Sequence, residues 1–434
     1  MNKKLFLGIV GLGTVGSGVI KSLELNSETF KRKYGMEYEI LGVSASDKNK
    51  SRSIKIDHYP WFDDPLSIPD IEKINVIIEL VGGEDGIAYD LSIKSLKKNK
   101  NLITANKALI SKHGKELAKI ADESNLFVGY EASVAGGIPI IKTLREGLLI
   151  NKVDKVFSIL NGTSNYILST MNETNRDFEE VLGEAQELGY AESDPTLDIN
   201  GYDSAHKLSI INALIFSEFP KVSDINIRGI EKIKLIDHNY ANEFGYNIRL
   251  IATSSLEERK FYKEVSPMLV KESSSLGKIN GAQNIIFLHN NENGNLILEG
   301  EGAGAGPTSS AVISDLVDCY LGTKLKFFGE SYENLSLGSS TLDAKERCYY
   351  FRVFLSDQKG AMAELTSLLS NNNISIDKII QKGDTHLADE KSSTPVVMMT
   401  YPVSIGVIES VVAEISGTDL ISMEPIFLPI LKEV

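Results

Sequence analysis

An acid-rich run near the middle of the chain, QELGYAESDPTLDINGYDSAHKL (Gln186 to Leu208), holds the residues best suited to chemistry. Asp203 and Lys207 stand four positions apart where the apolar spacing predicts a helix, so both side chains project from one helical face. Several carboxylates precede them, and such a loop suits a ligand that carries an ammonium group. A solvated acidic turn with a surface ion pair is the alternative interpretation.

A glycine-rich turn near the start of the chain, GLGTVGSG, predicts a dinucleotide site. It follows an apolar strand directly, opens a helical pattern and has the spacing G-x-G-x-x-G. These glycines permit a tight turn, close approach to a pyrophosphate and close helix–strand packing, and the helix N-terminus faces the phosphates. A glycine turn in some other α/β protein is the alternative. The expected cofactor-binding residues here are Gly11, Gly13, Thr14, Val15 and Gly16.

The residues after the second predicted strand bear on which dinucleotide binds. An acidic residue there would bind the ribose 2′-OH of NAD, whereas the 2′-phosphate of NADP needs a cation. The chain reads SASDKNKSR, with Asp47 among Lys48, Lys50 and Arg52. The basic residues favour NADP as the cofactor, and Asp47 leaves NAD as the alternative.

Length and composition are those of a globular protein with two or three domains. The chain has 434 residues, of which 42% are hydrophobic and 24% charged. A net charge of −14 argues against nucleic-acid and anionic-membrane partners, and no apolar run approaches the ~20 residues that span a bilayer. Two cysteines and six scattered histidines indicate neither a disulfide framework nor a transition-metal site. We expect a cytoplasmic protein.

The order of predicted elements indicates an α/β fold in three parts. Strands and helices alternate up to residue 130, with one helix expected over Gly114–Glu123, and this order predicts βαβ units and a parallel sheet of the Rossmann type. Residues 136–302 predict an α+β domain with a mixed sheet. A helix that starts near Pro307 is expected to return to the first domain. The dinucleotide-binding domain would then comprise residues 1–135 and about 303–328.

The end of the chain has a different order of predicted elements. Residues 329–348 are polar and rich in serine and glycine, which predicts a linker. Residues 349–434 follow the order strand, helix, strand, strand, helix, strand, which predicts a small ferredoxin-like α+β domain.

Several motifs together resemble the homoserine dehydrogenase family. They are GLGTVGSG, TANK (Thr104–Lys107), EASVAGGIPI (Glu131–Ile140), LNGTSNYIL (Leu160–Leu168), the GYAESDP…NGYDSAHKL run and GAGAGPTSSAV. The resemblance covers residues 5 to about 325, and the segment from 349 is similar to an ACT regulatory domain. It implies NAD(P)-dependent interconversion of L-homoserine and L-aspartate 4-semialdehyde, a step in threonine, methionine and isoleucine biosynthesis.

The resemblance also implies roles for individual residues. Lys207 matches the family's acid/base, and Lys107 matches a lysine beside the cofactor and the reacting carbon; a surface loop lysine is the alternative for Lys107. Gly304 matches a further cofactor position. The residues matched to the substrate are Glu192, Asp198, Asp203, Gly162, Thr163 and Tyr190.

Within that substrate set the expected contacts differ. Glu192 would accept the α-ammonium, and the backbone of Gly162 and Thr163 would bind the carboxylate. Tyr190 would close the pocket, and a buried core aromatic is its alternative.

One loop matches a monovalent-cation site, for an ion such as sodium, formed mostly by main-chain carbonyls. Its residues are Glu131, Val134, Gly136 and Ile138. A structural hinge between domains is the alternative for this loop.

The chain departs from the family pattern at two places. Ser46 stands where close relatives often have an arginine, and the usual D-x-P-G turn of the tail appears as Asp357-Gln358-Lys359-Gly360, without the proline that fixes such a turn. The tail therefore either binds an amino-acid effector such as threonine or serves only in dimerisation. The family implies a homodimer or a homotetramer, with residues 136–302 as the substrate-binding and dimerisation domain.

Two other functions fit parts of the pattern. A phosphorylating semialdehyde dehydrogenase needs a cysteine nucleophile, but Cys319 lies in a helix-like run and Cys348 opens the tail. A non-catalytic ligand sensor would need neither the glycine turn, nor both lysines, nor the full acidic run together.

Overall fold

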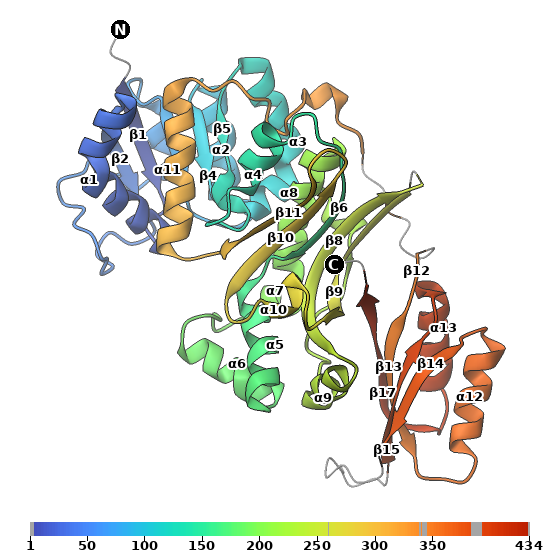
Figure 1. The fold of residues 1–434 in the computed structure, drawn as a ribbon. Helices are drawn as coiled ribbons and strands as arrows, with labels where there is room; N and C mark the ends of the chain where they lie inside the picture. The colour runs from blue at the N-terminus through green and yellow to red at the C-terminus, as the bar shows by residue number, and fades with distance from the viewer. Residues whose placement is uncertain (1–3, 259, 338–339, 341–344, 383–392, 433–434) are drawn as a thin grey trace. The chain divides into compact units, whose positions relative to one another are not determined.

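The computed structural model describes residues 4–258, 260–337, 340, 345–382 and 393–432. The chain forms two compact units, each assembled from separate stretches (Figure 1). The first comprises residues 1–162, 203–225 and 283–339, and the second comprises residues 163–202, 226–282 and 340–434. These boundaries differ from the three predicted domains, because the middle of the chain is divided between the two units.

A five-stranded parallel sheet forms the centre of the first unit, with the order β2-β1-β3-β4-β5. Its strands are β1 (Lys4–Val10), β2 (Glu37–Ser44), β3 (Val76–Glu79), β4 (Asn101–Thr104) and β5 (Val128–Gly129). Every residue of β3 is buried, as expected for a central strand with helices on both sides. The prediction of a Rossmann-type sheet is confirmed.

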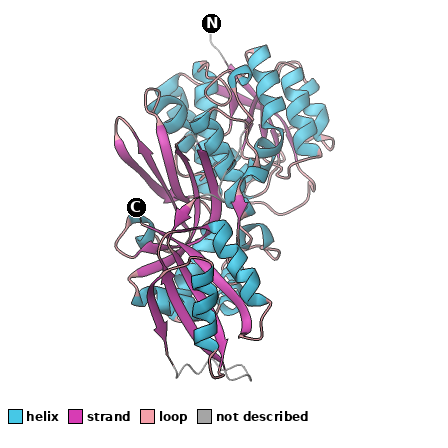
Figure 2. Ribbon diagram, turned by 90° about the vertical axis from the view of Figure 1, so that its right-hand side faces the viewer, coloured by secondary structure: helices cyan, strands magenta, loops and turns pink. Residues whose placement is uncertain are grey.

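Helices cover this sheet (Figures 1 and 2). They are α1 (Thr14–Tyr34), α2 (Ile87–Lys97), α3 (Lys107–Ser124) and α11 (Ala305–Leu321). Buried residues such as Val19 of α1 and Val312 of α11 share one core with Leu7 of β1. The helix that follows Pro307 therefore does return to the nucleotide-binding sheet, as predicted.

The rest of the first unit contains an antiparallel group and one long helix. β6 (Val153–Ile159) and β11 (Gly294–Glu301) both pair with β10 (Gln283–Asn290). Helix α8 (Tyr202–Phe216) is joined to α3 by a 2.8 Å hydrogen bond between Ser209 and Ser111.

The second unit contains a sheet with the order β8-β9-β17-β13-β15-β14. These strands are β8 (Tyr246–Glu257), β9 (Lys260–Lys271), β17 (Ile421–Leu431), β13 (Tyr349–Ser356), β15 (Ser393–Thr400) and β14 (Ile376–Gln381). The sheet is mixed, because β17 and the short β7 (Asn226–Ile227) run parallel to β9 whereas β8 runs antiparallel to it.

Within that sheet, the C-terminal segment has the predicted order of strands and helices. Helices α12 (Ala361–Asn371) and α13 (Ile405–Ser416) contribute Leu365 and Ile408 to a core shared with Phe351 of β13. The other helices of this unit are α5 (Gly162–Thr174), α6 (Phe178–Glu187), α7 (Thr196–Ile199), α9 (Leu235–Glu243) and α10 (Ser275–Lys278).

Two elements differ from the sequence predictions in their extent. Helix α3 begins at Lys107 rather than at Gly114, because the side chain of Asn106 caps it by accepting a hydrogen bond from the backbone of Leu109. Part of the predicted linker is folded, since Tyr332 N donates to Asp122 and Ser336 forms a bridge with Glu218.

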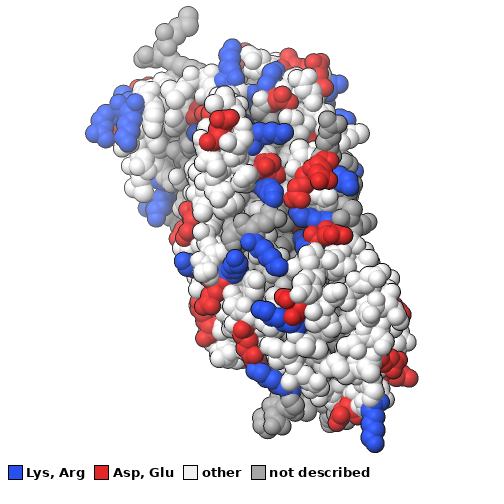
Figure 3. All heavy atoms as spheres, turned by 45° about the vertical axis from the view of Figure 1, so that its right-hand side comes forward, with Lys and Arg blue, Asp and Glu red and all other residues white. Residues whose placement is uncertain are grey.

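The surface carries both signs of charge. Figure 3 shows acidic and basic side chains interspersed on the face that it displays. Across the described residues, no helix combines the length and the apolar character that crossing a membrane requires.

Candidate active site

The glycine turn has the geometry of a phosphate-binding turn. Gly11 has a φ of 97°, and a Cβ there would lie 2.3 Å from the carbonyl oxygen of Leu80, so only glycine fits. A Cβ on Gly13, in contrast, would meet nothing within 4 Å. Gly13 also precedes α1 without a side-chain cap, which leaves the N-terminal N–H groups of α1 to a ligand. These residues fit a dinucleotide pyrophosphate.

A buried hydrogen-bond network at the ends of β3 and β4 positions Lys107. Glu79, which is fully buried, accepts hydrogen bonds from Thr104 Oγ1 at 2.5 Å and from Val81 N at 2.7 Å. Burial raises the pKa of Glu79, and these hydrogen bonds act against that rise. Asn106 donates to the carbonyl of Gly83 at 2.6 Å while it caps α3, so Lys107 is held as the first helical residue.

Asp203 binds both predicted catalytic lysines at once. Its Oδ1 lies 2.7 Å from Lys107 Nζ, and its Oδ2 lies 2.7 Å from Lys207 Nζ. Asn161 Nδ2 donates to the same Oδ2 at 2.9 Å, and Lys207 Nζ donates to the carbonyl of Leu160 at 2.7 Å. The two lysines are therefore held around one carboxylate within the first unit.

The burial of these groups differs. Asp203 is 5% exposed and Lys207 is 8% exposed, whereas the side chain of Lys107 is 40% exposed. Burial alone would raise the pKa of Asp203, but Lys207 and Lys107 outweigh that effect and hold it well below its usual range. Asp203 thus stays ionised and keeps both ammonium groups oriented.

The residues predicted to bind substrate, other than Asp203 and Gly162, lie in the second unit. Thr163 Oγ1 donates to the carbonyl of Tyr190 at 2.6 Å, and Ser164 Oγ donates to the carbonyl of Asp198 at 2.8 Å. These bonds tie the start of α5, at Gly162, to the acidic run.

Two side chains predicted to bind substrate, Tyr190 and Glu192, are accessible. Tyr190 is 47% exposed and packs against Tyr166 in a tilted arrangement, with ring centroids 4.7 Å apart, so it is not the core aromatic of the alternative interpretation. Glu192 is exposed as well. Gly304, with a φ of 113°, begins α11 without a side-chain cap.

The loop predicted to hold a cation is closely packed. Glu131 is 2% exposed, and its carboxylate accepts the N–H groups of Ile141 at 2.9 Å and Lys142 at 2.8 Å. Gly136 N donates to the carbonyl of Gly302, and Ile138 O accepts a hydrogen bond from Ile140 N. The groups of this loop that could coordinate a cation are a carboxylate and main-chain carbonyls, and a hard cation such as sodium prefers such oxygen ligands.

Three parts of this arrangement were not predicted as site residues. They are the carbonyl of Leu160, the amide of Asn161 and the carboxylate of Glu79. Leu160 and Asn161 belong to the motif LNGTSNYIL, so their sequence signal was present. Glu79 acts through residues of the neighbouring strand, and the sequence carries no local sign of that pairing.

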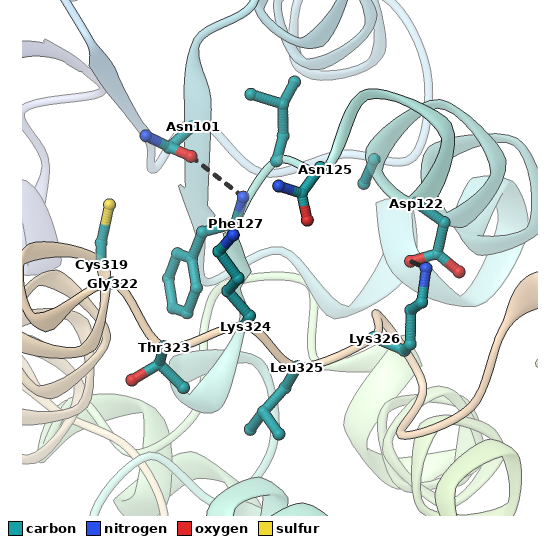
Figure 4. Close-up of a pocket in the computed structure, with 12 residues that line it drawn as sticks. Asn101, Asp122, Asn125, Phe127, Cys319, Gly322, Thr323, Lys324, Leu325 and Lys326 are labelled. Carbon is teal, nitrogen blue, oxygen red and sulfur yellow. Dashed lines mark hydrogen bonds and ion pairs between the residues drawn. The ribbon is translucent and has the colours of Figure 1, made fainter.

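A separate hollow of about 170 Å³ lies elsewhere in the first unit (Figure 4). Its lining includes Asn101 at the start of β4, Asn125 after α3, and Cys319 and Lys324 at the end of α11. It therefore opens at the amino ends of the strands, whereas the glycine turn and Lys107 follow their carboxyl ends. None of the predicted site residues lines it.

Family models match three consecutive parts of the chain. Residues 11–131 match the NAD-binding domain of homoserine dehydrogenase, residues 139–317 match homoserine dehydrogenase, and residues 349–417 match the ACT domain. Homoserine dehydrogenase from Neisseria gonorrhoeae is 35% identical over 426 residues, which cover 96% of this chain and 97% of that protein. The chain belongs to the homoserine dehydrogenase family.

Solved structures agree with this assignment. A homoserine dehydrogenase from Thiobacillus denitrificans has a TM-score of 0.90 at 33% identity, with 99% of this chain and 98% of that chain covered. A hyperthermophilic archaeal homoserine dehydrogenase mutant in complex with NADPH has a TM-score of 0.62 at 26% identity, with 74% and 98% covered. The predicted family, the predicted ACT domain and the prediction of a nicotinamide-dependent oxidoreductase acting on a CH–OH group are confirmed.

Proposed function

We propose that the protein interconverts L-homoserine and L-aspartate 4-semialdehyde, with Lys207 as the acid/base. The observation that carries this proposal is the buried Lys207 ammonium, 2.7 Å from Asp203 and 2.7 Å from the carbonyl of Leu160. A proton-transferring group has to be held within hydrogen-bond reach of the reacting oxygen, and these two contacts fix its position.

Each residue of the site would have its own role in the reaction. A bound nicotinamide ring exchanges a hydride with the hydroxyl-bearing carbon of homoserine. Neutral Lys207 accepts the hydroxyl proton during oxidation and returns it during reduction. Asp203 keeps Lys207 and Lys107 oriented, and the more exposed Lys107 interacts with the substrate oxygen and the cofactor.

Substrate binding follows from charge. Glu192 and Asp198 offer carboxylates to the α-ammonium, and Tyr190 covers the bound molecule. The first N–H groups of α5, at Gly162 and Thr163, offer donors to the α-carboxylate, and the helix dipole favours an anion there.

The direct test is the formation of reduced nicotinamide when L-homoserine is added to the enzyme and the oxidised cofactor. Turnover with homoserine, and none with the one-carbon-shorter L-serine, is the expected result. Absence of homoserine-dependent reduction with both NAD and NADP would contradict the proposal.

The loop after β2 supports a preference for NADP. Arg52 Nε donates to the carbonyl of Leu12 in the glycine turn at 3.2 Å, so this guanidinium lies against the phosphate-binding turn. Arg52 also lies over the ring of Trp61, 6.0 Å from its centroid. Asp47 accepts a hydrogen bond from Asn49 N at 2.8 Å, which engages the acid that would otherwise bind the ribose 2′-OH. In this proposal Arg52 takes the role of the arginine that the family often has at the position of Ser46, although its Nη1 also binds the carbonyls of Lys48 and Lys50.

Replacing Arg52 by methionine should raise the KM for NADP far more than the KM for NAD. A hydrogen bond to a charged group contributes about 1.5–3 kcal/mol, so the expected rise is about tenfold to a hundredfold. Steady-state kinetics with both cofactors measures it, and Arg52→Lys should retain part of the preference. Equal changes for NAD and NADP would show that Arg52 only organises the loop.

We further propose that the loop of Glu131 binds a monovalent cation such as sodium. Glu131 would supply the charge, and the carbonyls of Val134, Gly136 and Ile138 would complete the site. Since hydrogen bonds within the protein also engage Glu131 and Ile138, a structural hinge remains the alternative role of this loop.

The ACT domain offers a place for an amino-acid effector such as threonine. A hollow of about 500 Å³ is lined by Ser356, Asp357, Gln358, Gly360, Met362 and Thr394. Gly360 has a φ of 91° and precedes α12 without a side-chain cap, so N–H groups of α12 are open to a carboxylate. Asp357 would bind the effector's ammonium group.

Threonine should slow homoserine oxidation by the full-length enzyme, and Asp357→Asn should abolish that effect. The control is Asp377→Asn, which changes an exposed acid of the same domain. Rates of homoserine oxidation, measured with and without threonine for the wild type and both variants, test this prediction. An unchanged wild-type rate would instead support an ACT domain that serves only in assembly. Deleting the domain is not a clean test, because β17 pairs with β9.

We also propose a cytoplasmic location, on the basis of the low cysteine content, and a homodimer or homotetramer, on the basis of the family resemblance.

A further inference from the structure

A buried carboxylate in the second unit is shared by two arginines from distant parts of the chain. Glu264 of β9 is fully buried, and its Oε1 lies 2.6 Å from Arg228 Nη2 while its Oε2 lies 2.6 Å from Arg347 Nη2. Ser266 Oγ donates to Oε1 at 2.9 Å. Burial raises the pKa of Glu264, but Arg347 and Arg228 outweigh that effect and lower it, so the cluster is ionic.

Arg347 directly precedes the ACT domain, and the ACT domain itself adds an aromatic ring to this cluster. The guanidinium of Arg228 lies 4.6 Å from the ring centroid of Phe427 in β17. The same strand pairs with β9 through Ile430 and Leu431. Arg228 is thus held between a carboxylate of the middle sheet and an aromatic ring of the ACT domain.

The backbone beside Arg228 supports the turn that leads into the catalytic helix. Arg228 N donates to the carbonyl of Val265 at 2.8 Å, and Ile230 N donates to the carbonyl of Ile199 at 2.8 Å. Ile199 ends α7, and Gly201 follows with a φ of 85°.

The packing around Gly201 is tight. A Cβ there would lie 3.1 Å from Val265 and 3.3 Å from Ile227, so the turn sits directly on the Arg228 segment. Helix α8, which carries Asp203 and Lys207, begins at the next residue.

We propose that Arg228 is a positioning residue through which the ACT domain fixes the homoserine-binding turn. Phe427 and the carboxylate of Glu264, which Arg347 binds from its other side, hold the side chain of Arg228. The backbone of residues 228–230 holds the Ile199–Gly201 turn. This inference rests on the proposed function, because the turn joins Asp198 of the substrate set to Asp203 and Lys207. The cofactor-binding glycine turn is not part of the connection.

The test is steady-state kinetics of full-length Arg347→Met, which removes the cation that binds Glu264 from the segment directly before the ACT domain. Misplacement of a binding group by about 1 Å costs up to about a hundredfold, so we expect the KM for homoserine to rise by about tenfold. The KM for the cofactor should stay within about twofold, since the glycine turn is not displaced. Hydrogen exchange should show faster exchange of the amides of residues 199–201, a readout that needs no turnover.

Three further variants keep the test decisive. Arg347→Lys should recover part of the affinity for homoserine, and Phe427→Leu, which leaves the ion cluster intact, should shift the same KM if Arg347→Met fails to fold. Lys232→Met is the matched control, because it removes an exposed cation that pairs with Glu424 of β17. It should change neither constant.

The outcomes separate the two claims. Unchanged homoserine KM and unchanged exchange at residues 199–201 in folded Arg347→Met would overturn the inference. A parallel rise in both KM values would also overturn it, because that result indicates general loosening. Wild-type enzyme that does not oxidise homoserine would instead refute the proposed function.

Discussion

Replacing Lys207 by methionine should lower kcat for homoserine oxidation by about a thousandfold while cofactor affinity stays near the wild-type value. General acid–base catalysis contributes about 10²–10⁴-fold, so the expected loss corresponds to about 4 kcal/mol of barrier. Methionine keeps the length and the apolar stem of a side chain that is 8% exposed, and therefore isolates the amine. Turnover under saturating substrates, together with binding of the reduced cofactor followed by fluorescence, measures the two effects.

A surface lysine provides the control for this variant. Lys94→Met removes an amine that pairs with Asp70 on the exposed side of α2, and it should retain wild-type turnover. If Lys207→Met kept wild-type kcat, another group would have to carry the proton.

Asp203→Asn should both destabilise the protein and slow catalysis. The amide cannot neutralise the two ammonium groups at 2.7 Å, and removal of one partner from a buried ion pair costs about 3–5 kcal/mol. The lysines would also lose their orientation, for which we expect about a hundredfold lower kcat. Chemical denaturation and steady-state kinetics measure the two effects.

The stability loss should depend on pH in a defined direction. The pKa of Asp203 is lowered in the folded protein, so on acidification the unfolded chain takes up the proton first. The contribution of Asp203 is therefore fully present above the ordinary carboxyl pKa of about 4 and is lost as the pH falls through the folded value. The difference between wild type and Asp203→Asn should be largest near neutral pH.

Asp224→Asn is the matched control for that measurement. Asp224 also pairs with a lysine, Lys221, but the lysine is 50% exposed. This variant should therefore lose much less stability. Equal losses in both variants would contradict a special role for the Asp203 cluster.

Local chemistry made much of the nucleotide-binding part predictable. The spacing of Gly11, Gly13 and Gly16 specifies a strand–turn–helix unit, because the whole motif lies within a few consecutive residues. The i, i+4 spacing of Asp203 and Lys207 likewise specified their ion pair once the helix was assigned. A local signal was also overlooked, since Asn106 is a good N-cap and marks the true start of α3.

Pairings between distant segments explain what the sequence did not reveal. The contact of Lys107 with Asp203 joins residues nearly a hundred positions apart, and only the family resemblance indicated it. The shared carboxylate of Glu264 and the pairing of β17 with β9 join the end of the chain to its middle. Nothing in the spacing of Arg228 or Arg347 marks such a partner, because two partly buried arginines look like surface residues until the fold is known.

The pH dependence of kcat for homoserine oxidation, compared between wild type and Lys207→Met, tests the central claim most directly. Oxidation requires Lys207 in its neutral form, so the wild-type rate should fall as the pH is lowered. The residual rate of Lys207→Met should lack that decline. The same decline in both enzymes would contradict the assignment of Lys207 as the group that takes the hydroxyl proton.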